Sequence, residues 1–135
     1  MCIRDSIIVN HWPSRGADET KRIAAAEVNN LIIDSLRSIH NNPKIITMGD
    51  FNDDPFDKSI KKVLGAKKEI KNVGKNDLYN PFEKILVEKG IGTNAYRDKW
   101  QLFDQIILSR EFLDCLLYTS PSPRDATLSR MPSSA

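Results

Sequence analysis

The feature that most constrains the fold of this chain is a strand–helix–strand pattern in its first third. Residues 7 to 10 or 11 and residues 44–49 are short apolar runs rich in β-branched residues, which predict two buried strands. Between them, residues 18–40 follow a helical pattern, with Asp18 as a suitable N-cap and Pro43 just past the end. The residues predicted to form the apolar stripe of this helix are Val28, Leu31, Ile32, Leu36 and Ile39, interrupted by Ser35.

Shorter elements follow in the rest of the chain. Asp54 as N-cap, Pro55 at the first position and Gly65 past the end predict a short helix. Residues 78–89 suggest a loop and another short helix, and residues 92–101 and 102–109 suggest strands with a turn near 97–99. This mixture predicts a layered α/β or α+β fold rather than a helix bundle or a small barrel.

Composition excludes several classes of protein. The 135 residues are enough for one domain, and a net charge of +2 gives no general footprint for nucleic acid or an anionic membrane. No apolar run approaches the roughly 20 residues that cross a bilayer, and two cysteines make neither a disulfide framework nor a zinc site. Seven lysines lie between residues 58 and 75, which favours a solvated face; a contact with phosphates is the alternative.

The two ends of the sequence are unusual. Residues 1–6 and 115–120 can be back-translated into stretches of DNA that are reverse complements of each other, as the adapters of sequencing libraries are. Residues 115–135 contain three prolines and several serines, which predicts a disordered tail. We therefore expect residues 1–6 and 115–135 to be non-native and residues 7–114 to be a partial domain, the alternative being a genuine start and a genuine flexible tail.

Three short segments place polar side chains at the ends of the predicted strands or inside them: residues 10–15, 48–55 and 103–109. A buried carboxylate without a partner is costly, so acids at such positions usually pair with another group or with a metal. Asp104 lies inside an apolar strand, where it would pair with a histidine or lie beside a metal.

Asp50 and Asn52 follow the second strand, after a glycine that allows a tight exit. If the backbone stays extended, both side chains point the same way, and together they can hold a water and a phosphate oxygen. A plain turn is the alternative interpretation. His11 is either a structural histidine or a donor to a phosphate.

Two further side chains lie beside these groups. Arg15 could hold a phosphate through its fork of donors, although a surface arginine is the commoner case. Trp12 is suited to packing, with stacking on a base or ligand as the alternative. Asp53 and Asp54 are explained as a surface residue and a helix cap.

Taken in order, the motifs His-Trp-Pro-Ser-Arg, Gly-Asp-Phe-Asn-Asp-Asp-Pro and Phe-Asp-Gln-Ile-Ile-Leu-Ser resemble the endonuclease/exonuclease/phosphatase superfamily, the deoxyribonuclease-like fold. The resemblance covers nearly all of residues 7–114. It implies a four-layer sandwich of two β-sheets flanked by helices, here truncated at both ends. It also implies a hydrolase of phosphate esters that uses Mg²⁺ or Mn²⁺.

The same resemblance implies roles for individual residues. His11 matches a histidine that contacts the phosphate, and Asp50 matches the acid that orients or deprotonates the attacking water. Asn52 matches an amide that contacts the phosphate and, with Asp50, supports the metal. Asp104 matches an acid that orients a catalytic histidine or neighbours the metal. Arg15 and Trp12 are the candidate substrate contacts.

The sequence also departs from the family pattern. A metal-binding glutamate upstream of residue 7 and a closing Asp-His pair are not present, and His40 is better explained as the end of a helix than as a replacement for that histidine. We therefore expect little or no hydrolase activity from this chain alone. The alternative function is a non-catalytic relative that acts as a binding or scaffold module. The substrate could be DNA, RNA, a lipid or a small phosphate ester; localisation and oligomeric state are not predicted.

Overall fold

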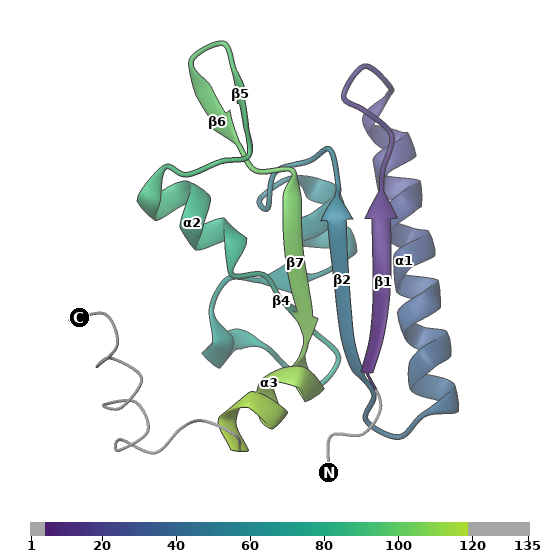
Figure 1. Cartoon of the computed structure of the whole chain (residues 1–135). Coiled ribbons are helices and arrows are strands. Elements are labelled where there is room, and N and C mark those ends of the chain that lie inside the picture. The colour runs from purple at the N-terminus through teal and green to yellow at the C-terminus, as the bar shows by residue number, and fades with distance from the viewer. Residues whose placement is uncertain (1–4, 119–135) are drawn as a thin grey trace, which may run out of the picture.

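The computed structural model describes residues 5–118 (Figure 1). The interpretation of residues 1–4 and 119–135 as non-native lies outside the described residues. Within them, residues 115–118 belong to a helix, so the predicted disordered tail does not begin at residue 115. The reason is that the first proline of that segment is Pro121, and nothing before it breaks a helix.

Seven strands and five helical segments make up the described chain. The strands are β1 (Asp5–His11), β2 (Lys44–Asp50), β3 (Ala66–Lys67), β4 (Leu78–Tyr79), β5 (Asn94–Tyr96), β6 (Lys99–Gln101) and β7 (Asp104–Ser109). The α-helices are α1 (Glu19–Ile39), α2 (Phe82–Lys89) and α3 (Arg110–Tyr118), and there is a short π-helix η1 (Ser59–Val63) and a 3₁₀ helix η2 (Ile70–Asn72). No helix of residues 5–118 is long and apolar enough to cross a membrane.

The five-stranded sheet has the order β1-β2-β7-β4-β3, and β5 and β6 form a separate hairpin. β1 runs parallel to β2, with α1 as the crossover between them, whereas β7 runs antiparallel to both β2 and β4 (Figure 1). This arrangement confirms the predicted α/β (α+β) class. The turn predicted near residues 97–99 lies inside the β5–β6 hairpin. Residues 102–109, predicted as the next strand, contain β7, which pairs with β2 and β4.

The core lies between one face of this sheet and α1. Ala26 and Ile33 of α1 pack with Ile45 of β2 and Ile107 of β7, and each of the four is at most 2% exposed. Each of these apolar side chains contributes on the order of 1.5–3 kcal/mol on burial, apart from the smaller alanine. Thus the crossover helix and the two central strands hold the fold together.

The prediction of the buried face of α1 was wrong for most of its residues, although Leu36 is partly buried and packs against the core. The buried residues are Arg22, Ala26, Asn29 and Ile33. Val28, Leu31 and Ile39 of the predicted stripe are more than half exposed. Polar residues occupy the inner face because their side chains bond to groups on the sheet and its loops, which apolar periodicity alone does not reveal.

The other face of the sheet is open within residues 5–118. Ile7 and Val9 of β1 are 61% and 77% exposed, and Ile106 of β7 is also exposed. The strand register places Ile46 and Met48 of β2 on this same face. An apolar sheet face of this kind normally packs against another layer.

Candidate active site

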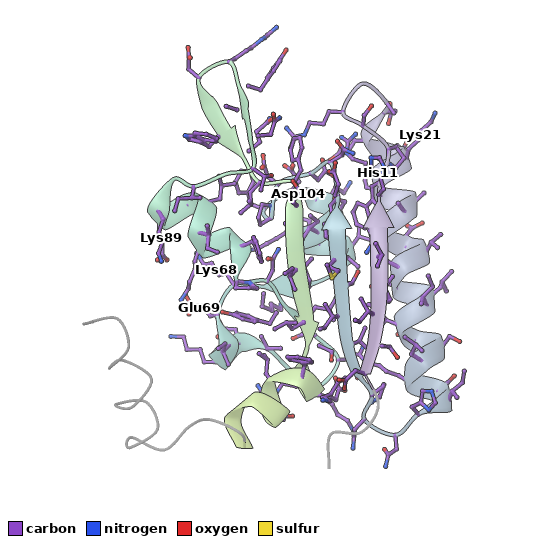
Figure 2. All side chains as sticks on the ribbon, viewed as in Figure 1. His11, Lys21, Lys68, Glu69, Lys89 and Asp104 are labelled. Atoms are coloured by element: carbon purple, nitrogen blue, oxygen red, sulfur yellow. The ribbon has the colours of Figure 1, made fainter. Side chains whose placement is uncertain are left out.

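Three polar side chains meet at one edge of the sheet. His11 is the last residue of β1, Asp50 is the last of β2, and Asp104 is the first of β7. In the register of the sheet His11 is paired with Asp50, and Asp50 with Asp104. Figure 2 shows His11 and Asp104 at the same edge. The sequence-predicted residues at positions 11, 50 and 104 are therefore neighbours across three adjacent strands.

The three side chains also lie on one face of the sheet. Side chains alternate along a strand, so His11 shares a face with Ile7 and Val9, and Asp104 shares a face with Ile106. His11 Nε2 lies 4.0 Å from Asp50 Oδ2, and their side chains are 80% and 40% exposed. A ligand that approaches the open face at this edge would reach both groups.

The pairing of Asp50 with Asp104 has an electrostatic consequence. Carboxylates directly opposite each other on one sheet face repel, which favours a cation beside them. Carboxylate oxygens suit Mg²⁺, which commonly takes only one or two of them and completes its shell with water and phosphate oxygens. The described residues contain no cluster of three or more His, Cys, Asp or Glu side chains that could hold a metal. Asp50 and Asp104 could therefore supply only part of the shell of such an ion, and the remaining ligands would have to come from other oxygens, water or substrate.

Asn52 lies beside Asp50. An extended backbone between them was considered from the sequence, but the backbone turns there. Asn52 has a φ of 51°, and its N–H donates to Asp50 Oδ1 over 3.0 Å. Its Nδ2 donates to the carbonyl of Trp12 over 2.8 Å. The Asx turn shapes the loop after β2, and the hydrogen bond from the Asn52 side-chain amide joins this loop to the end of β1.

Gly49 permits the close pairing of β1 and β2 just before Asp50. Its φ is +131°, and a Cβ at this position would lie 2.1 Å from the carbonyl oxygen of Asn10. Only glycine fits both conditions. Its role is therefore the close approach of the two strands that carry His11 and Asp50.

Arg15 is engaged by acidic groups of the neighbouring loop. Its Nη2 contacts Asp54 Oδ2 at 3.2 Å and also pairs with Asp57, and its Nε donates to the Asn52 carbonyl over 3.2 Å. The guanidinium also lies 4.7 Å from the centroid of the Phe103 ring. A phosphate would have to compete with these partners, so the predicted phosphate contact of Arg15 stays a prediction.

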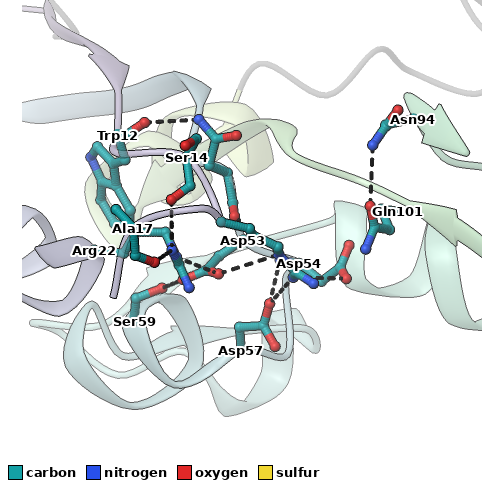
Figure 3. Close-up of polar contacts among 12 residues, drawn as sticks. Trp12, Ser14, Ala17, Arg22, Asp53, Asp54, Asp57, Ser59, Asn94 and Gln101 are labelled. Atoms are coloured by element: carbon teal, nitrogen blue, oxygen red, sulfur yellow. Dashed lines mark hydrogen bonds and ion pairs between the residues drawn. The ribbon is translucent and has the colours of Figure 1, made fainter. Parts of the chain in front are cut away.

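A buried ion pair between α1 and the loop after β2 was not predicted from the sequence. Arg22 Nε donates to Asp53 Oδ1 over 2.8 Å, and the two side chains are 8% and 4% exposed. Arg22 Nη1 also donates to the carbonyls of Ser14 and Ala17, and Ser59 Oγ donates to Asp53 Oδ2 over 2.6 Å (Figure 3). α1, the loop after β1 and the loop after β2 are thus fixed to one another.

The interpretation of Asp53 as a surface residue was wrong, because Asp53 is buried. Asp54 is not a helix N-cap either, because η1 begins only after Lys58. Asp54 Oδ1 accepts the Leu102 N–H over 2.7 Å, and Gln105 Nε2 donates to the Asp53 carbonyl over 2.8 Å. Burial raises the pKa of Asp53 and of Asp54 above the usual aspartate value. These contacts tie the loop after β2 to the segment that leads into Asp104.

Trp12 belongs to the core rather than to the accessible surface. It is 4% exposed, its ring packs edge-on against Phe51 with centroids 4.8 Å apart, and its Nε1 donates to Asn10 Oδ1 over 3.1 Å. A ring enclosed in this way has no free face for a base. The structure therefore contradicts the stacking role proposed for Trp12 and agrees with its packing role.

A second polar network lies between α1 and the face of the sheet that this helix covers. It was also not predicted from the sequence. Asn29 of α1 donates from Nδ2 to Asn10 Oδ1 over 2.7 Å and to Thr47 Oγ1 over 2.9 Å. Asn10 is adjacent to His11, so this network anchors the end of β1 from the inner face. The adjacent amides Asn29 and Asn30 in the helical pattern were a possible signal. The partners of Asn29 lie on β1 and β2, which the helical pattern does not indicate.

The lysine-rich segment is mostly a solvated face. Six of its seven lysines are exposed, and Lys61 pairs with Glu83 at 2.7 Å. Figure 2 shows Lys68 and Glu69 away from the edge that carries His11 and Asp104. Lys68 therefore lies away from the candidate site.

Comparison with known proteins agrees with these features. The family model described as the endonuclease/exonuclease/phosphatase family matches residues 4–124. Neither a search of curated proteins nor a search of solved structures found a significant match to the chain. The family match covers most of the 135 residues and all three segments that carry the site. The chain therefore belongs to the endonuclease/exonuclease/phosphatase family.

Proposed function

We propose that this chain carries the phosphate-binding edge of a divalent-metal-dependent hydrolase of phosphate esters. The family supports a phosphoester hydrolase fold in general. The observation that carries the finer proposal is the row of His11, Asp50 and Asp104, paired in register on one face at one sheet edge. An imidazole beside two carboxylates combines a donor for a phosphate oxygen with ligands for a cation.

Each side chain has a proposed role. His11 donates a hydrogen bond or a proton to a phosphate oxygen, since its exposed imidazole can meet a substrate from solvent. Asp50 orients or deprotonates the attacking water. Asp104, on the neighbouring strand, completes the negative potential that attracts the cation. Arg15 contacts the substrate only if a phosphate displaces its acidic partners.

Asp50 and Asn52 are the proposed protein ligands of Mg²⁺ or Mn²⁺. When bound, such an ion supplies Lewis-acid stabilisation of charge on the phosphoryl oxygens. The chain contributes positioning: the Asx turn holds Asn52 against Asp50, and the Trp12 carbonyl fixes the Asn52 amide. Preorganised groups of this kind do not need to reorient during the reaction.

We expect the 135-residue chain by itself to hydrolyse phosphate esters slowly or not at all. The described residues contain no cluster of three or more metal-ligating side chains. A catalytic unit that lacks one member can lose nearly all of its rate. Cation binding and hydrolysis must therefore be measured separately.

The test of this proposal uses bis(4-nitrophenyl) phosphate and 4-nitrophenyl phosphate with Mg²⁺, Mn²⁺ or EDTA. Any metal-dependent rate should fall about 10²-fold or more in His11→Ala and Asp50→Ala. His40→Ala, at the far end of α1, is the matched control and should leave the rate unchanged. A rate that survives both site substitutions would contradict the proposal, as would the absence of both cation binding and hydrolysis, the outcome expected of a scaffold.

A further inference from the structure

The β5–β6 hairpin carries exposed rings and cations that the candidate site does not use. Tyr96 and Trp100 are each 56% exposed, and the Arg97 guanidinium lies 5.2 Å from the centroid of the Tyr96 ring. A two-stranded hairpin is only marginally stable in water, and large rings normally stabilise a protein from inside a core. These side chains are therefore better placed to bind a ligand than to stabilise the fold.

The register of the hairpin distributes these groups over both of its faces. Tyr96 is paired with Lys99, so a ring and an ammonium group lie side by side on one face. Trp100 is paired with the small Ala95 on the opposite face, which leaves its indole ring unobstructed by a cross-strand neighbour. Each face thus presents one aromatic ring, and one face adds a positive charge.

The turn of the hairpin is strained. Arg97 and Asp98 have φ values of 49° and 62°, in the left-handed region that two-residue hairpin turns require and usually fill with Asn-Gly. A long side chain in that region costs on the order of 1–2 kcal/mol. Strain of this kind is concentrated at functional segments, and here it holds a guanidinium on the Tyr96 ring.

The hairpin is closed at its base and leads directly into the edge that carries the candidate site. At its base, the Thr93 N–H donates to the Gln101 carbonyl over 2.9 Å, and Gly92 approaches so closely that a Cβ would lie 2.5 Å from that oxygen. The chain then passes through Leu102, held by Asp54, directly into Asp104. Figure 1 shows the hairpin projecting beyond the edge where β1 and β2 end and β7 begins.

We propose that the β5–β6 hairpin is a binding arm for single-stranded nucleic acid, which it presents to the neighbouring edge. Every nucleobase has a π-face, so Tyr96 and Trp100 can stack on bases without regard to sequence. Arg97 and Lys99 supply charges that complement the phosphates. This inference rests on the proposed function and names its substrate class, because the phosphate ester would then belong to a nucleic acid strand.

The two tryptophans of the chain allow a direct test, since Trp12 is buried and Trp100 is exposed. Short oligothymidylate is titrated into the 135-residue chain in EDTA at low salt, which separates binding from hydrolysis. Quenching of Trp100 fluorescence is expected, and it should disappear in Trp100→Phe. By fluorescence anisotropy with labelled oligothymidylate, Trp100→Ala and Tyr96→Ala should each weaken binding about 10-fold. Arg97→Ala should reduce its salt dependence.

The matched control is Ile39→Ala, which removes an exposed apolar side chain at the far end of α1 and should not change binding. Three results would overturn the proposal. They are no binding of oligothymidylate, equal loss of affinity in Ile39→Ala, or binding to anionic phospholipid vesicles that competes with the oligonucleotide and exceeds it in affinity.

The hairpin proposal and the proposed function fail in different ways. Hydrolysis of bis(4-nitrophenyl) phosphate involves no base, so Trp100→Ala should leave any such rate unchanged. If the small diester is hydrolysed but oligothymidylate does not bind, only the hairpin proposal is overturned. If oligothymidylate binds through Trp100 but the chain neither binds a cation at Asp50 nor hydrolyses the small diester, the hairpin is supported and the hydrolase proposal is overturned.

Discussion

Arg22 of α1 and Asp53 of the loop after β2 form a buried ion pair, with Nε and Oδ1 2.8 Å apart. Ser59 donates to the second oxygen of the carboxylate, and two carbonyls of the loop after β1 accept from the guanidinium. The pair therefore joins the loop that follows His11 to the loop that follows Asp50. Its contribution lies in holding those loops, because the desolvation of two buried charges offsets much of their attraction.

Replacement of Arg22 by Met should destabilise the protein by about 3–5 kcal/mol, since Asp53 would remain buried without its countercharge. The measurement is urea denaturation followed by circular dichroism. Lys84→Met, which breaks the more exposed pair with Glu69, is the control and should have a much smaller effect. Equal effects of the two substitutions would show that the buried pair does not hold the loops.

Substitution of Gly49 by Ala should disrupt the pairing of β1 with β2, because the added Cβ would lie 2.1 Å from the Asn10 carbonyl oxygen. Gly65 is the matched control: it also has a positive φ, but an added Cβ would meet nothing within 4 Å, so Gly65→Ala should cost only about 1–2 kcal/mol. Thermal denaturation of both variants tests the difference. A Gly49→Ala variant as stable as Gly65→Ala would refute the close-approach role.

Trp12→Ala should cost about 3–5 kcal/mol in unfolding free energy, as expected for an aromatic side chain removed from a core. Trp12→Phe should retain most of that stability and should bind oligothymidylate as the unsubstituted chain does, measured by fluorescence anisotropy. A selective loss of oligonucleotide affinity in Trp12→Phe, without a loss of stability, would restore the stacking role that the structure contradicts.

The buried and exposed aspartates should affect stability with opposite dependence on pH. Burial raises the pKa of Asp54, so the folded state holds its proton to higher pH than the unfolded state does. Its contribution to stability is therefore full below the ordinary pKa of 3.8 and is lost as the pH rises through the raised value. The Thr20 backbone N–H lowers the pKa of Asp18, whose contribution is present above 3.8 and lost as the pH falls.

Urea denaturation between about pH 3 and pH 6 measures these two contributions. Relative to Asp54→Asn, the unsubstituted chain should lose stability as the pH rises. Relative to Asp18→Asn, it should gain stability over the same interval. The same sign for both variants would show that burial does not dominate the titration of Asp54.

Part of the candidate site was predictable from the sequence because polar residues interrupt or end apolar runs. His11 lies at the end of one predicted strand, and Asp50 directly follows another. Asp104 was predicted inside a strand and buried; it is instead the first residue of β7 and is exposed. Parallel and antiparallel pairing then bring all three to one edge. The fold class followed from the same runs, since a strand, a helix of crossover length and a second strand allow few arrangements.

The supporting contacts were not predictable, because each depends on a partner distant in the sequence. Arg22 and Asn29 lie on the inner face of α1, where apolar periodicity predicted aliphatic residues. Asp53 is buried only because Arg22 lies opposite it, and a local pattern of acids indicates a surface loop equally well. The Asx turn at Asn52 depends on a left-handed backbone conformation that residue spacing does not specify.

Binding of a divalent cation at the edge where His11, Asp50 and Asp104 lie can be tested without any catalysis. The chain has two histidines, and His40 at the C-terminal end of α1 serves as an internal reference. Substoichiometric Mn²⁺ should broaden the His11 imidazole resonances in NMR spectra and spare those of His40. Mg²⁺ should compete, and substitution of either proposed ligand, in Asp50→Asn and in Asn52→Ala, should abolish the effect. Equal broadening of both histidines, or broadening that persists in both variants, would contradict the claim.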